Sequence, residues 1–116
     1  MNKKQIKKTE KQIIEQLTKV CHLALAQIEG FVWLTHKVNY DQLQSSLIVI
    51  CVFDTQASAS QAQLKQQQIT LKDWIVEHLK TVNICLNKPD KQIKLDNEQA
   101  CEKQHQGNWH ARISQL

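Results

Sequence analysis

Lysine side chains concentrate at the beginning of the chain, and their spacing gives the clearest indication of a chemistry. Residues 1–12 contain five lysines and one glutamate, whereas residues 13–116 contain ten basic and ten acidic side chains. A local excess of ammonium groups suits the phosphates of RNA or DNA, or an anionic membrane surface. The alternative is a solvated helix face that keeps the protein soluble. The residues predicted to bind nucleic acid are Lys3, Lys4, Lys7, Lys8 and Lys11, extended by Lys65 and Lys72.

A metal site is the second chemistry that the residue types suggest. Cys101 and His105 are four residues apart, so a helix would place both on one face, with His110 as a third ligand. The spacing matches no closed zinc module, and the alternative is a buried thiol beside surface histidines. We therefore predict neither a metal nor a cofactor.

Cys51 is the candidate nucleophile, on a predicted strand whose neighbour carries His36. A reactive thiol needs an electropositive, partly exposed setting, but Cys51 lies within the apolar run Leu47–Phe53, which would raise its pKa. Asp54 follows that run and is predicted to serve as a turn or helix cap. Because no carboxylate pair or Ser/His/Asp arrangement stands out, we expect no catalytic residues and no enzyme activity.

A long amphipathic helix is expected to carry the N-terminal lysines. Apolar residues recur at spacings of three, four and seven, which predicts a helix over about residues 4–28. Gly30 follows where a helix C-terminus favours a residue that tolerates positive φ. Lysines 4, 7, 8 and 11 fall opposite the apolar stripe, where phosphates could reach them.

Alternating and helical patterns divide the remainder of the chain. The central run is apolar at every position, as expected of a strand covered on both faces. The predicted elements are strands over 31–38 and 47–53 forming an antiparallel hairpin, helical residues 58–83 that are either broken near Ile69–Thr70 or kinked, a strand over 91–95, and a short helix over about 98–106 ended by Gly107.

The length and composition predict one α+β domain spanning residues 1–116, with 41% hydrophobic and 22% charged residues. Its basic arm is residues 1–11 and its C-terminal helix and tail are residues 98–116. The order α-β-β-α-α-β predicts a three-stranded sheet with helices packed on one face.

No segment approaches the roughly 20 apolar residues of a membrane span, and no secretion signal is recognisable. We therefore expect no membrane partner and a cytoplasmic protein with reduced cysteines.

Three segments resemble the ribosome-binding factor A family, small bacterial proteins with a type II KH-like fold. They are Gly30-Phe31-Val32-x-x-Thr35, the strand Ser46–Val52, and the helix Leu71–Leu86 followed by Pro89–Asp96. The similarity covers about residues 10–97. It implies a KH-like sheet and a partner that is RNA or a ribosomal subunit.

The sequence thus predicts a non-catalytic accessory protein that binds RNA or ribosomal particles. The alternative is a protein–protein adaptor or a homodimer without nucleic acid. Trp33 is expected to stack on bases or to pack in the core or a dimer, and Trp109 to lie on the sheet or meet another chain.

Overall fold

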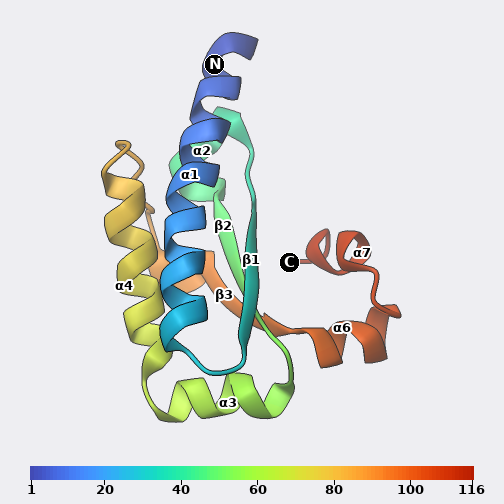
Figure 1. Cartoon of the computed structure of the whole chain (residues 1–116). Helices are drawn as coiled ribbons and strands as arrows, with labels where there is room; N and C mark the ends of the chain where they lie inside the picture. Colours follow the sequence, from blue (N-terminus) through green and yellow to red (C-terminus); the bar gives the residue numbers. More distant parts are fainter.

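Seven α-helices, one short 3-10 helix and a three-stranded mixed sheet form the computed structural model, which describes residues 1–116 (Figure 1). The α+β class and the order of the long elements agree with the prediction, and the additional short helices lie in connections and in the C-terminal tail. The elements are α1 (Lys3–Gln27), β1 (Phe31–Lys37), η1 (Tyr40–Gln42), α2 (Leu43–Ser46), β2 (Ile48–Phe53), α3 (Gln56–Leu64), α4 (Gln67–Lys80), α5 (Pro89–Gln92), β3 (Ile93–Asn97), α6 (Glu98–His105) and α7 (Trp109–Ile113).

The turn from α1 into β1 depends on Gly30. Its φ of +84° lies in the left-handed region, which side chains with a Cβ disfavour. A Cβ at this position would also lie 2.4 Å from the Cβ of Ser58 on α3. Glycine therefore permits both the chain reversal and the close approach of α3.

The sheet has the order β1-β2-β3, with β1 antiparallel and β3 parallel to the central strand. The predicted hairpin is confirmed, and the parallel partner arrives through the α3–α4 crossover. Both faces of β2 are buried: Val49, Cys51 and Phe53 belong to the main core, while Ile50 and Val52 on the other face are also fully buried. This explains why β2 is apolar at every position.

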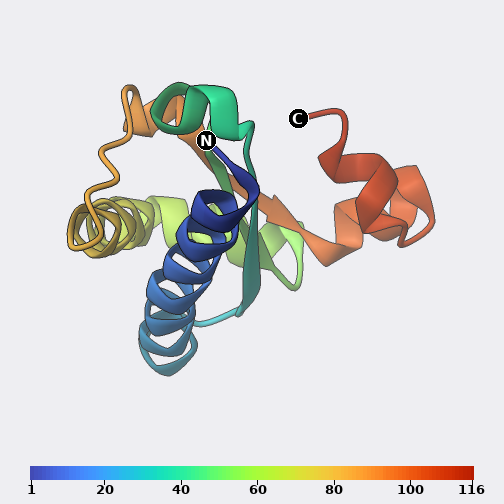
Figure 2. The same cartoon turned by 90° about the horizontal axis from the view of Figure 1, so that it is seen from above.

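Helices α1 and α4 cover the same face of the sheet, as Figures 1 and 2 show from two directions. Each contributes a stripe at helical spacing to the core, which is how a helix with one apolar face packs on a sheet. The stripe residues are Ile13, Leu17, Val20 and Ala24 from α1, and Leu71, Ile75 and Leu79 from α4.

The C-terminal helices lie on the opposite side of the sheet from α1 and α4 (Figure 2). Trp109 of α7 meets Trp33 of β1 edge to face, with ring centroids 4.9 Å apart. Lys37 Nζ donates to the carbonyl oxygen of Ile113 at 3.2 Å and to that of Leu116. These contacts hold α7 against β1.

The break between α3 and α4 lies at Lys65–Gln66, so its predicted place near Ile69–Thr70 was wrong. Gln66 has φ +59°, in the left-handed region, and this change of backbone direction separates the two helices. Thr70 is exposed within the first turns of α4. The third strand also begins later than predicted, because Pro89–Gln92 forms a helical turn.

Candidate nucleic-acid interface

The basic N-terminal arm is a well-capped helix. The side chain of Asn2 accepts from the Gln5 backbone N–H at 2.9 Å, and the Gln5 side chain accepts from the Asn2 backbone N–H at 3.1 Å. This reciprocal capping box satisfies two N–H groups that a helix start would leave without partners. The arm therefore presents its lysines from a defined helix.

All five predicted lysines of the arm have exposed side chains, and none takes part in a salt bridge. The first turns of α1 extend past the ends of the strands, at the top of Figure 1. Glu10 is the one acid among residues 1–12 and is itself exposed. The arm thus offers several unpaired ammonium groups to a polyanion from one end of the molecule.

Lys65 and Lys72 do not join this group. Lys65 is exposed at the turn between α3 and α4, at the opposite end of the molecule from the start of α1 (Figure 1). Lys72 is partly buried on α4, and its Nζ lies 3.5 Å from the Asp90 carboxylate. The predicted lysines therefore do not form one surface: those of α1 lie together, Lys65 lies far from them, and Lys72 is paired with Asp90.

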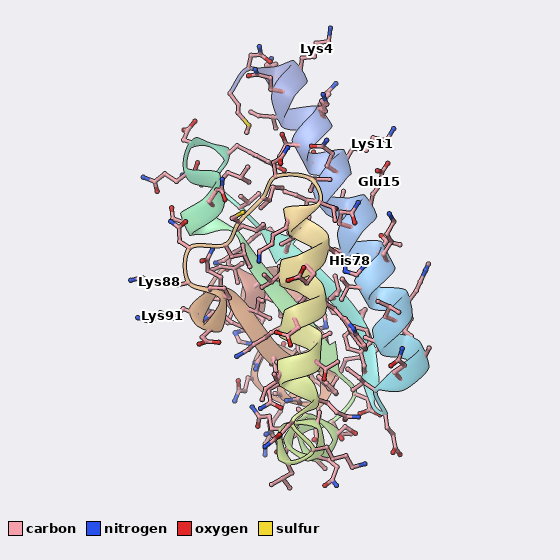
Figure 3. All side chains as sticks on the ribbon, turned by 90° about the vertical axis from the view of Figure 1, so that its left-hand side faces the viewer. Lys4, Lys11, Glu15, His78, Lys88 and Lys91 are labelled. Atoms are coloured by element: carbon pink, nitrogen blue, oxygen red, sulfur yellow. The ribbon has the colours of Figure 1, made fainter.

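Two further lysines, Lys88 and Lys91, are candidate phosphate-binding residues that the sequence analysis did not predict. Lys88 lies immediately before α5 and Lys91 lies within it. Both are exposed and form no salt bridge. Figure 3 places them beside α4, whereas Lys4 and Lys11 lie on α1 beyond the C-terminal end of that helix. Their spacing of three around Pro89 and Asp90 was the available signal, but nothing in the sequence related them to residues 1–12.

The Cys51–His36 pair does not form. The register places Cys51 opposite Leu34, while His36 is paired with Val49. Cys51 is fully buried, and desolvation raises its pKa to about 12. The thiol therefore stays protonated at neutral pH, because the positive charge of Lys72 does not offset the effect of burial on its pKa.

The residues of the candidate metal site have different surroundings. Cys101 is fully buried, and desolvation raises the pKa of its thiol. His105 Nδ1 lies 3.2 Å from Arg112 Nη1, its Nε2 lies 3.3 Å from the Gln115 side-chain oxygen, and His110 is exposed. No group of three or more His, Cys, Asp or Glu side chains is placed to hold a metal ion.

The two tryptophans that were candidates for stacking contact each other. Trp109 lies on the sheet against Trp33, and the Trp33 indole N–H also donates to Glu98 at 3.3 Å. This pair lies on the far side of the sheet from α1. The structure therefore separates the aromatic candidates from the basic arm.

In comparisons with known proteins, no family model, curated protein or solved structure matches the chain. None of its helices is both long and apolar enough to cross a lipid bilayer.

Proposed function

We propose that this protein binds RNA, alone or within a ribosomal particle, through the lysines at the N-terminal end of α1, as a non-catalytic accessory protein of the cytoplasm. One observation supports this most directly: the five lysines are exposed and free of salt bridges on a capped helix that projects beyond the sheet. Phosphate contacts of this kind supply most of the affinity in sequence-independent binding.

The resemblance to ribosome-binding factor A supports RNA as the polyanion. The order α-β-β-α-α-β is the one expected of a KH-like fold. KH domains clamp the nucleic-acid backbone with a Gly-x-x-Gly loop. This chain contains two glycines, Gly30 and Gly107, and neither lies in the α3–α4 turn. In this protein the backbone contacts are made by lysine side chains.

A charge-reversal experiment tests the proposal. The probe is a fluorescent RNA hairpin with single-stranded tails, titrated with the protein at several salt concentrations. The double variant Lys4→Glu/Lys11→Glu should bind at least about tenfold more weakly, and the log–log salt slope should become about 1.5 shallower. Its matched control, Lys65→Glu/Lys103→Glu, makes the same charge change at two exposed lysines away from the arm and should stay within about threefold of wild type.

If both double variants lost the same affinity for RNA, binding would depend only on the protein's net charge. That result would overturn the proposed site. A wild-type protein that does not bind the hairpin at any salt concentration would overturn the function itself. Sedimentation of cell extract then asks whether the protein travels with ribosomal subunits, as an accessory factor should.

The second candidate function, an adaptor or homodimer, is favoured by apolar side chains at the α3–α4 turn. Leu64 is 78% exposed and Ile69 is 50% exposed. Exposed apolar side chains that cluster are typical of protein contacts. Analytical ultracentrifugation tests this: a dimer lost in Leu64→Ser/Ile69→Ser would support it, and a monomer at all concentrations would count against the homodimer.

A further inference from the structure

Lysines from two separate parts of the chain lie around the C-terminal end of α4. Lys4 and Lys11 lie on α1 beyond the C-terminal end of α4, and Lys88 and Lys91 lie beside α4 at and just before α5 (Figure 3). All four are exposed and make no salt bridge. This face therefore carries two rows of free ammonium groups.

The exposed surface of α4 beside Lys88 and Lys91 is acidic. Asp73 and Glu77 are exposed and one helical turn apart, on the side of α4 opposite its buried stripe. Glu77 lies 3.7 Å from Lys80 Nζ, which leaves that lysine less free to bind a phosphate. A phosphate backbone that ran along α4 from Lys88 and Lys91 would meet these carboxylates. Two separate backbones, one on each row, would avoid them.

Amide and hydroxyl side chains make up most of the lining of a hollow beside the α1 lysines. The hollow of about 350 Å³ lies between the start of α1 and the loop after α4. Amide and hydroxyl groups of this kind donate to and accept from ribose 2′-hydroxyls, which are displayed in the shallow minor groove of an RNA duplex. The residues that line the hollow are Met1, Gln5, Lys8, Thr9, Gln12, Val82 and Asn83.

The aromatic rings are engaged within the protein. Phe31 and Phe53 pack on each other in the core, and Trp33 is paired with Trp109. Trp74 and Tyr40 are half-buried against the core cluster. Proteins that bind single strands without sequence preference stack bases on aromatic platforms. No aromatic residue of this protein is fully exposed, so the lysines lie beside no open stacking platform.

From these observations we infer that the RNA ligand is double-helical, with the α1 lysines on one strand, Lys88 and Lys91 on the other, and the groove facing the hollow between α1 and the loop after α4. The inference rests on the proposed function and specifies its substrate class. Duplex RNA is recognised largely by shape, phosphates and 2′-hydroxyls, which is what this face offers.

The test compares three labelled probes at one ionic strength: an RNA duplex of about 20 base pairs, an unstructured RNA strand of the same length, and the DNA duplex of the same sequence. We expect the RNA duplex to bind at least about tenfold more tightly than the strand, and more tightly than the DNA. Lys88→Glu/Lys91→Glu should weaken duplex binding about tenfold and make its salt slope about 2 shallower. The control is again Lys65→Glu/Lys103→Glu, which should retain duplex binding.

Tighter binding of the single strand, or of the DNA duplex, would overturn the inference while leaving a nucleic-acid-binding function in place. Duplex binding that survives Lys88→Glu/Lys91→Glu unchanged would also overturn it, because the second row would then contact nothing. Failure of both RNA probes to bind would instead overturn the proposed function, so the two failures are distinguishable.

Discussion

Arg112 of α7 and Asp96 of β3 form a two-point ion pair that fastens the C-terminal helices to the sheet. The Nε and Nη2 groups of Arg112 donate to the two carboxylate oxygens at 2.6 Å and 2.8 Å. The side chains are only 14% and 10% exposed, and hydrogen bonding to Asp96 raises the pKa of Arg112 further. Nη1 of Arg112 also donates to the Gln104 side chain at 2.7 Å. A buried charge pair of this quality depends on both partners.

Removing one partner of this pair should be costly. Arg112→Gln leaves the Asp96 carboxylate buried without its counter-charge, and we expect unfolding in urea to require about 3 kcal/mol less free energy. The double variant Asp96→Asn/Arg112→Gln should lose less than the two single variants added together, because no unpaired charge remains. Lys103→Gln, at an exposed lysine of α6, is the control and should change stability by less than about 0.5 kcal/mol. A wild-type unfolding midpoint in Arg112→Gln would contradict the pair's role.

The two glycines should differ in their tolerance of a methyl group. Gly30→Ala puts a Cβ at φ +84° and 2.4 Å from the Ser58 Cβ, so α3 must move, and we expect a loss of at least about 2 kcal/mol. Gly107→Ala has a similar φ of +79°, but its new Cβ meets the end of the flexible Glu102 side chain. Its loss should be about 1 kcal/mol. Thermal unfolding of both variants measures the difference, and equal losses would show that α3 is not held by close contact.

His36 should make the protein more sensitive to acid. Burial lowers the pKa of His36 in the folded protein, and the nearby Glu10 offsets this in part. The unfolded chain therefore binds the proton more readily, and this group's contribution to stability is lost as pH falls below about 6.5. Urea unfolding at pH 7.5 and pH 5 should show a smaller acid-induced loss in His36→Gln than in wild type. His22→Gln, at an exposed histidine of α1, is the control; if both variants behave alike, burial of His36 is not the cause.

The four cysteines should react with a thiol reagent in a fixed order. Cys85 is exposed, Cys21 is partly buried with a raised pKa, and Cys51 and Cys101 are fully buried. At pH 8 we expect one fast reaction, removed in Cys85→Ser, then a slow reaction of Cys21. Cys51, whose pKa is about 12, and Cys101 should react only as the protein unfolds. Rapid labelling of Cys51 in the folded protein would contradict its burial.

The long helix and the strands were predictable because their information is local. The stripe from Ile13 to Ala24 repeats at helical spacing, and Gly30 marks the reversal into β1. The apolar run of β2 predicted a strand covered on both faces, and both faces are buried. The arm lysines were likewise visible as a cluster in one short segment.

Contacts between distant parts of the chain decided the rest, because such contacts leave no period in the sequence. The break between α3 and α4 is set by the left-handed backbone conformation of Gln66. A glutamine in the sequence does not predict this conformation. No sequence pattern indicated that Arg112 would form an ion pair with Asp96. Likewise, none indicated that Trp109 would pack on Trp33. Only the folded chain places Lys88 and Lys91 on the same side of the molecule as Lys4 and Lys11, since the parallel crossover to β3 brings α5 next to α4.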